Sequence, residues 1–388
     1  MLSALRMVAP LTAVTMVVAA CSGGAAAGGP VGDRPGCIAE FDPAADYFPD
    51  KSTLLDATNF AIDYHRSYQV LTVKQPHPHG RPESYVLVRC GAPAPALTGD
   101  LAGAQHITVP VTSLYSASTT HLGMIAELGR PDVVTGVASP AQVTDQQIRA
   151  RIEAGDTVGY APGRQTNVEA VIGAGPDVLV TAGVDDPSHP KLRAAGIGVV
   201  ANAEWLEATP LGRAEWIKVF AALTGTERAA ERIYRTVRAD YHRWAARTAG
   251  IPPEQVLLGA MYQGSWPMPS GAGYTGRLVS DAGGRHPWQA DTGLPGLALN
   301  FESVYLKAGD APHWLVTTGW RSLADAVAED GRYATLAAFR NGQIWSATAD
   351  YWERGAARPD LLLADMIAIM HPELAPGHHF DLYRQVPA

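Results

Sequence analysis

Apolar segments of strand length alternate with helical patterns downstream of about residue 105. Residues 106–111 are predicted as a strand, followed by a loop rich in Ser and Thr and by an apolar helix over about 118–128. Further strands are expected at 133–137, 178–181 and 197–200, with short helices between them. Strands that alternate with helices predict a mainly parallel sheet covered by helices.

A long helical pattern follows at about 226–248 and ends before Gly250. Thr224 and Glu227 have the spacing of a capping box, with Thr224 as the N-cap. About 24 residues at 1.5 Å each give a rod of roughly 36 Å, which is long enough to join two lobes. Because the pattern contains no Pro or Gly, we expect a rigid helix and only small rocking of the lobes.

The segment after this helix repeats the order of the segment before it, with a strand at 256–261, a glycine-rich loop and a helix that ends near Ala282. Three short matches recur in the same order on both sides: 125–130 with 279–285, 167–171 with 300–304, and 180–183 with 316–319. Three matches in one order predict two lobes of the same build, with a ligand cleft between them.

The region before residue 105 differs from the rest. Residues 64–74 and 83–90 are rich in Val, Tyr and Leu and are separated by several Pro residues, which predicts a β-hairpin with a long loop. The fold class is therefore α/β: two α/β lobes joined by one long rigid helix, plus an N-terminal β-hairpin extension. The expected division is a signal peptide at 1–20, a lipid-anchored flexible tether at 21–36, the extension at 37–104, the N-lobe at 105–222, the linker helix at 223–249 and the C-lobe at 250–388.

The first twenty residues are typical of a signal peptide. Arg6 is the only charged residue there, and residues 11–20 form an apolar segment too short to span a membrane well. The segment ends Val18-Ala19-Ala20-Cys21, which resembles a bacterial lipobox. The resemblance implies that Cys21 is lipidated and becomes the first mature residue, outside the cytoplasmic membrane, with residues 22–30 as a flexible tether. The alternative is an ordinary signal peptide with a chance cysteine.

Cysteine usage agrees with export. The chain has three cysteines, so lipidation of Cys21 would leave Cys37 and Cys90 as an even pair in an oxidising compartment. We predict a Cys37–Cys90 disulfide; the alternative is two buried free thiols.

Composition narrows the function classes. The chain has 388 residues, of which 18% are charged and 47% hydrophobic, so we expect a globular protein of two domains. The net charge is −8 and there is no long block of Lys or Arg, which argues against a nucleic acid partner.

Residues 105–388 resemble the iron-siderophore and cobalamin class of ABC-importer substrate-binding proteins. The resemblance lies in Asn-Val-Glu at 167–169 with Gly-Pro-Asp-Val at 175–178, Ala-Gly-Ile at 195–197, Leu-Thr-Gly at 223–225 and Asp-Ala-Gly-Gly at 281–284. Residues 349–354 look like the final cleft loop of the cobalamin-binding member. The family fold is two α/β lobes on one rigid helix, and the N-terminal extension departs from it, which leaves open an extra partner or a covered cleft edge.

The resemblance also implies a docking role for Glu169 and Glu302, which occupy equivalent positions in two repeated segments. In the family, one surface carboxylate per lobe binds arginines of the importer's membrane subunits, because two ion pairs fix register as well as affinity. The alternative is that both are first-turn acids favoured by the helix dipole.

The ligand is expected at loops that follow the carboxyl ends of the strands. Aromatic side chains there would bury a flat or bulky ligand, and Arg would neutralise its carboxylates or catecholates. Trp266, Tyr351 and Trp352 are the strongest candidates, because Gly, Pro or Asp residues surround them; core or interface packing is the alternative for the whole set. The set is Ser116, Ser118, Tyr160, Arg164, Tyr262, Trp266, Tyr274, Arg285, Trp320, Asp350, Tyr351 and Trp352.

Other motifs are weak. Residues 271–276 match G-x-G-x-x-G but do not directly follow a strand, so we interpret them as a cleft loop rather than a dinucleotide site. Histidines at 77, 79, 378 and 379 lack partnering acids or cysteines, and the S-x-x-K at 188–191 lacks its companion motifs. We predict no catalytic residue, metal site or cofactor.

The favoured function is a monomeric extracytoplasmic lipoprotein that captures a ferric siderophore, haem or cobalamin and docks to an ABC permease. The alternatives are a cell-envelope hydrolase and an adhesive or structural lipoprotein that uses the extension. The repeated Glu segments and the linking helix favour the first, and the lack of a recognisable acid–base set disfavours the hydrolase.

Overall fold

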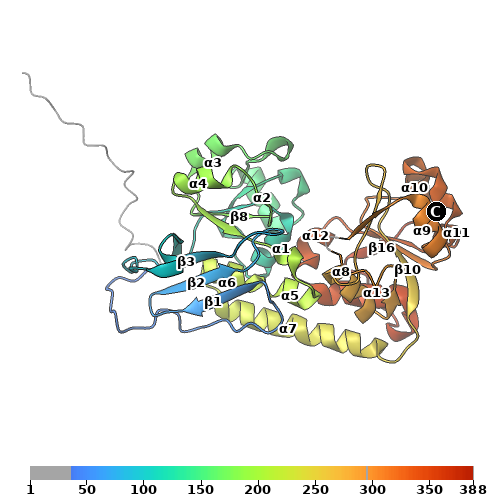
Figure 1. The fold of residues 1–388 in the computed structure, drawn as a ribbon, viewed down its shortest axis with the longest axis horizontal. Coiled ribbons are helices and arrows are strands. Elements are labelled where there is room, and N and C mark those ends of the chain that lie inside the picture. Colours follow the sequence, from blue (N-terminus) through green and yellow to red (C-terminus); the bar gives the residue numbers. More distant parts are fainter. Residues whose placement is uncertain (1–35, 294–295, 388) are drawn as a thin grey trace, which may run out of the picture.

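The computed structural model describes residues 36–293 and 296–387, apart from the side chain of Arg164. Two α/β lobes lie side by side along the helix α7 (Glu227–Ala245), and a separate sheet packs on the first lobe (Figure 1). The predicted signal peptide, Cys21 and most of the tether lie outside the described residues. No helix in the described part of the chain has the length and apolarity needed to cross a bilayer.

The N-lobe is a five-stranded parallel sheet in the order β7-β6-β5-β8-β9. The three strands predicted at 133–137, 178–181 and 197–200 are confirmed. The strands are β5 (Leu114–Ser116), β6 (Val134–Val137), β7 (Val158–Gly159), β8 (Val178–Thr181) and β9 (Gly198–Ala201). The helices are α1 (Thr119–Glu127), α2 (Gln146–Ala154), α3 (Val168–Ala174), α4 (His189–Ala194), α5 (Pro210–Ala214) and α6 (Ile217–Thr224).

The extension forms a four-stranded sheet, of which β1 (Phe60–Tyr64), β2 (Tyr68–Val73) and β3 (Glu83–Arg89) are antiparallel. The predicted hairpin is thus confirmed, with one further strand. The strand predicted at 106–111 exists as β4 (Gln105–Val109), but it pairs with β3 of the extension and not with the N-lobe sheet. The predicted boundary between extension and N-lobe is therefore corrected, because strand periodicity does not reveal which sheet a strand joins.

The disulfide between Cys37 and Cys90 is confirmed, with the two Cα atoms 4.9 Å apart. Ile38 N–H donates to the carbonyl of Cys90 at 2.9 Å, so the backbone also pairs beside the bridge. The bridge ties the start of the extension to the end of β3.

Two buried carboxylates hold the segment before β1 on the N-lobe. Glu215 accepts hydrogen bonds from the N–H groups of Leu55, Asp56 and Ala57, at 2.9, 2.7 and 2.7 Å. Glu207 accepts from Thr58 N–H at 3.0 Å. Apolar side chains of β1–β3 share one core cluster with the N-lobe. The extension is therefore an integral layer of the first lobe rather than an appended module.

The linker helix α7 begins at Glu227, and a short 3₁₀ turn at 246–248 continues it. It packs on α6 in the N-lobe and on α13 (Pro359–Met370) in the C-lobe. The predicted capping box does not form, because α6 runs as far as Thr224 and the Thr224 hydroxyl donates to the carbonyl of Phe220. Thr226 is the N-cap instead, without a side-chain hydrogen bond.

The C-lobe sheet has the order β12-β10-β14-β15-β16, parallel except for β16. A small antiparallel sheet of β11 and β13, which the sequence did not predict, lies beside it. The strands are β10 (Glu254–Leu258), β11 (Trp266–Met268), β12 (Gly284–Arg285), β13 (Leu297–Leu299), β14 (His313–Val316), β15 (Ile344–Ala347) and β16 (Tyr383–Gln385). The helices, besides α13, are α8 (Tyr274–Asp281), α9 (Phe301–Ala308), α10 (Leu323–Glu329), α11 (Ala337–Arg340) and α12 (Tyr351–Gly355).

The repeated segments at 167–171 and 300–304 have the same local structure. The side chain of Asn167 caps α3 by accepting from Ala170 N–H at 3.1 Å. The side chain of Asn300 caps α9 by accepting from Ser303 N–H at 2.8 Å. The internal similarity in the sequence therefore corresponds to a structural repeat.

Candidate functional site

A pocket of about 680 Å³ lies at the carboxyl ends of the N-lobe strands. Its walls are the loops that follow the strands: Ala117 after β5, Ala138 after β6, Tyr160 after β7 and Ala182 after β8. We call it the N-lobe pocket. Open parallel sheets bind ligands at this edge, because the loops there converge on a crevice.

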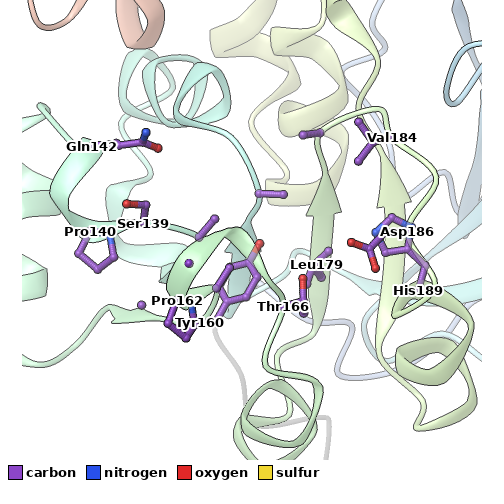
Figure 2. A pocket seen from close by; sticks show the side chains of 16 residues that line it. Ser139, Pro140, Gln142, Tyr160, Pro162, Thr166, Leu179, Val184, Asp186 and His189 are labelled. Carbon is purple, nitrogen blue, oxygen red and sulfur yellow. The ribbon is translucent and has the colours of Figure 1, made fainter. Parts of the chain in front are cut away.

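One wall of the N-lobe pocket is aromatic and polar. Ser139, Gln142 and Tyr160 lie opposite Asp186 and His189 across the pocket (Figure 2). The Tyr160 ring stacks on Tyr115 with centroids 5.2 Å apart, which fixes its position. Its hydroxyl is buried, and burial raises the pKa of Tyr160 well above its ordinary value. The phenol therefore stays neutral at physiological pH and presents an amphipathic surface.

The other wall carries two titratable groups. Burial opposes ionisation of Asp186, but hydrogen bonds from Ser188 hold the pKa of Asp186 below its ordinary value. One of them is donated by Ser188 N–H at 2.8 Å. Burial lowers the pKa of His189, and Asp186 offsets this only in part. At neutral pH this wall therefore offers a carboxylate and a neutral imidazole.

Ser116 and Ser118 line a smaller pocket of about 130 Å³ that shares Ala117, Ala138 and Gln142 with the N-lobe pocket. The hydroxyl of Ser116 donates to the carbonyl of Ser118 at 2.8 Å and lies 2.9 Å from Nδ1 of His121. Ser118 is the N-cap of α1. Both predicted residues are thus close to the site, where their hydroxyls are engaged in internal hydrogen bonds.

The buried His121 is expected to make the stability of the folded protein depend on pH. Burial lowers its pKa to about 4, so between that value and about 6.5 the unfolded chain binds a proton that the folded chain does not. The free energy of unfolding should therefore fall by about 3 kcal/mol as pH drops through this window. Urea unfolding between pH 4 and 7 measures it. His121→Gln should make the pH profile shallower, whereas His106→Gln, at an exposed position, should leave it unchanged. Equal slopes in wild type and both variants would contradict the assignment.

The two lobes touch at one end of the cleft through α12 and α1. The carboxylate of Glu353 in α12 is buried and accepts from the N–H groups of Thr144 and Asp145 in the N-lobe, at 2.7 and 3.2 Å. Gly123 in α1 allows the close approach, because a Cβ there would lie 1.8 Å from the carbonyl oxygen of Glu353. If the two lobes separated, both hydrogen bonds to Glu353 and the packing of α1 on α12 would be lost together.

A second contact between the lobes encloses a pocket of about 200 Å³, which we call the interlobe pocket. Trp205 and Leu206 line it from the N-lobe, and Ser270 and Tyr274 from the C-lobe. Trp205 donates from Nε1 to the carbonyl of Ala182 at 3.2 Å, and Ala182 lines the N-lobe pocket. The two pockets therefore adjoin along one cleft.

Arg213 holds this second contact together. Its guanidinium lies 4.3 Å from the centre of the Tyr274 ring in the C-lobe and 3.3 Å from the carboxylate of Glu204. Both charged side chains are buried. The cation–π contact across the lobes adds to the rigidity expected from α7.

Several predicted ligand residues lie along this cleft. Tyr160 lines the N-lobe pocket and Tyr274 the interlobe pocket. Asp350 lines a third pocket, of about 480 Å³, between α1, α2 and α12, where it pairs with Arg354 at 3.0 Å. Tyr262 and Trp352 are exposed aromatic residues of the C-lobe. The side chain of Arg164 lies outside the described residues.

Three other predicted ligand residues, Trp266, Trp320 and Arg285, do not line the pockets described above. Trp266 is fully buried in the C-lobe core, where its Nε1–H donates to the carbonyl of Leu258. Trp320 is also buried and donates to Glu329. Arg285 is exposed at the end of the short strand β12, where its backbone pairs with Gln255 near the start of β10. Tyr351, by contrast, is partly buried, packs on the Tyr383 ring and lies near Tyr274 and Arg213 at the second contact between the lobes.

Trp266 and Trp320 therefore lie in the C-lobe core and not on the cleft pockets where the sequence placed them. Neighbouring Gly and Pro residues indicated loops, but Trp266 begins the unpredicted strand β11, whose pairing with β13 carries it into the core. Sequence reasoning also missed four lining or bridging residues. Asp186 and His189 lie in the loop and helix that follow β8, so the expectation that ligands bind beyond the carboxyl ends of strands could have identified them. The sequence around Trp205 and Arg213 contains no comparable pattern. 

Glu169 and Glu302 are exposed, each at the second residue of its helix, α3 or α9. Glu302 forms an ion pair with Arg332 at 3.0 Å. Neither residue lines the pockets of the cleft described above.

Comparison with known proteins gives consistent results. The profile of a family described as periplasmic binding protein matches residues 114–351. An uncharacterised lipoprotein of Methanocaldococcus jannaschii is 27% identical over 287 residues, which are 71% of this chain and 69% of the relative. A periplasmic haem-binding protein of Pseudomonas aeruginosa has a TM-score of 0.53 at 19% identity, over 68% of this chain and 93% of that chain. A periplasmic vitamin B12-binding protein of Vibrio cholerae has a TM-score of 0.52 at 16% identity, over 69% of this chain and 99% of that chain.

Proposed function

Because the chain belongs to the periplasmic binding protein family, we propose that it is the extracytoplasmic, lipid-anchored substrate-binding protein of an ABC importer. It captures a metal-bearing or macrocyclic ligand, namely a ferric siderophore, haem or a corrinoid, and docks to the membrane subunits. The observation that carries the proposal is the N-lobe pocket, which opens at the carboxyl edge of one lobe beside a second lobe of the same build. The role is one of binding and delivery.

The size and lining of the cleft suit such ligands. The N-lobe pocket, at about 680 Å³, falls in the usual range for small-molecule sites. Leu179 and Pro162 provide apolar surface, while Ser139, Gln142 and Thr166 provide hydrogen-bonding groups (Figure 2). A bulky ligand would fill the N-lobe pocket and extend past Trp205 toward the interlobe pocket.

The ligand class can be tested directly by calorimetric titration of the mature protein. The probes are haemin, cyanocobalamin and a ferric catecholate siderophore, which represent the three chemistries. We expect one probe to bind with a dissociation constant of about 1 μM or tighter, which corresponds to roughly 8 kcal/mol of binding free energy. Failure of all three probes to bind would contradict the proposed ligand class.

Glu169 and Glu302 are proposed as the docking pair. Replacing either with Ala should leave ligand affinity unchanged, because neither lines the cleft pockets. It should weaken docking by on the order of 1–3 kcal/mol where the ion pair is partly desolvated, and by less where it is fully wet. A Lys at either position should be worse than Ala, because it brings like charges together. The measurement is ligand titration beside uptake in cells that carry each variant.

Glu302 differs from Glu169 in one respect. Its internal partner Arg332 also pairs with Asp330, at 2.7 Å. Asp330 would therefore still neutralise Arg332 when Glu302 pairs with an arginine of the importer.

Loss of ligand binding in solution by Glu169→Ala would contradict the docking assignment and would move the ligand site to that residue.

A further inference from the structure

The two helices that carry the proposed docking carboxylates also expose large apolar side chains. Ile172 in α3 is 42% exposed and Tyr305 in α9 is 44% exposed. Each lies three residues after the Glu of its own helix, so in each helix the carboxylate and the apolar side chain share one face. In α9 the next residue, Leu306, is 83% exposed.

These side chains are not displaced core residues. The preceding positions, Val171 and Val304, are fully buried in their lobes, so each helix already directs an apolar residue inward. The two helices share an Asn cap, a Glu at the second position and an exposed apolar residue at the fifth. A single exposed apolar residue is ordinary. The same residue pattern in both lobes indicates a partner that presents the same kind of surface twice, once to each lobe.

The C-lobe part of this surface is preorganised. Tyr305 stacks on Phe301 with ring centroids 6.0 Å apart, and the guanidinium of Arg332 lies 4.5 Å from the centre of the Phe301 ring. Arg332 in turn pairs with Glu302. The carboxylate and the aromatic ring are therefore held beside each other before any partner arrives, which reduces the entropy lost on binding.

We propose that Ile172, Tyr305 and Leu306 form the apolar half of a two-part docking surface whose charged half is Glu169 and Glu302. This inference rests on the proposed function. The occupant is the pair of importer membrane subunits, each with a basic side chain beside an apolar recess. A two-part partner fits because α3 and α9 belong to separate lobes and both lie in the half of the molecule away from α7 (Figure 1). Buried apolar anchors commonly carry most of the energy of such interfaces, with charges setting orientation.

Photocrosslinking in the native host tests the surface. A benzophenone amino acid replaces Ile172 or Tyr305 in the lipid-anchored full chain, and Leu55, which is 57% exposed on the extension, serves as the control position. We expect crosslinks from 172 and 305 to a polytopic ABC membrane subunit, identified by mass spectrometry, and none from 55. Glu169→Lys should reduce the yield at 172 by about tenfold. Crosslinks to a second copy of the chain, or yields equal to the control, would overturn the proposal.

Substitution separates this inference from the function on which it rests. Ile172→Ser and Tyr305→Ser should each lower uptake by about five- to tenfold, as expected for interface anchors, while binding of the probe that wild type binds stays unchanged. Leu55→Ser should affect neither. If no probe binds wild type, the proposed function fails. If probes bind and Glu169→Lys abolishes uptake while both Ser variants transport normally, only the apolar docking surface is refuted.

Discussion

Replacing Glu215 with Ala is expected to lower the free energy of unfolding by about 3–5 kcal/mol, the range for removing one partner of a buried charge pair. Glu215 and Lys218 are both fully buried, with Nζ and the carboxylate 2.8 Å apart. Without Glu215, the N–H groups of Leu55, Asp56 and Ala57 lose their acceptor. Lys218 then loses one of its two carboxylate partners and keeps Glu231, a backbone carbonyl and the face of the Tyr234 ring. Urea unfolding of the mature protein measures the change.

A matched control lies nearby, where the extension meets the linker helix α7. Arg228 pairs with Asp50 at 3.1 Å, but their side chains are 77% and 40% exposed. Arg228→Ala should therefore cost less than about 1 kcal/mol. Glu215→Ala combined with Lys218→Met should recover part of the loss, because it leaves no stranded charge. An equal effect of Glu215→Ala and Arg228→Ala would show that the buried carboxylate does not hold the extension in place.

Filling the N-lobe pocket should abolish ligand binding without unfolding the protein. Ala138 lines this pocket and is partly exposed, so Ala138→Trp should project an indole into open space rather than overpack a core. If the indole makes the free energy of ligand binding less favourable by more than about 3 kcal/mol, affinity falls by at least about 100-fold. Titration with the probe that binds wild type gives the result.

Two further variants show whether the loss is specific to the pocket. Ala138→Ser should bind within a few-fold of wild type, because it hardly changes the volume. Val327→Trp adds the same indole to an exposed site on α10 and should have no effect. Unchanged affinity in Ala138→Trp would place the ligand elsewhere in the cleft, toward the interlobe pocket.

The sequence was sufficient to predict the architecture because the patterns involved are local or repeated. Periodicity located β6, β8 and β9, and the matches at 167–171 and 300–304 identified two helices with the same cap. Cysteine parity identified the Cys37–Cys90 bridge. Each of these predictions depends on the residue pattern within one helix or strand, on a repeated segment or on the number of cysteines. None of them requires knowledge of tertiary contacts.

Tertiary pairing explains what the sequence could not predict. Strand β4 has the composition of an N-lobe strand, yet it joins the extension sheet through β3. Trp266 and Trp320 lie in turn-like sequence, but the C-lobe core takes both of them together with Trp314 and Tyr333. Trp205 and Arg213 reach the cleft only because two lobes are packed against each other. Their roles depend on contacts between distant segments, which residue type and spacing do not encode.

Native mass spectrometry of the protein purified from its own host tests the central claim most directly. If the chain captures a small ligand in the N-lobe pocket, wild type should carry a non-covalent adduct of one reproducible mass, and Ala138→Trp purified in parallel should lack it. Ala138→Ser should retain the adduct. An adduct of the same mass and occupancy in Ala138→Trp, or a wild-type protein free of ligand in every preparation that also binds none of the three probes, would contradict the account.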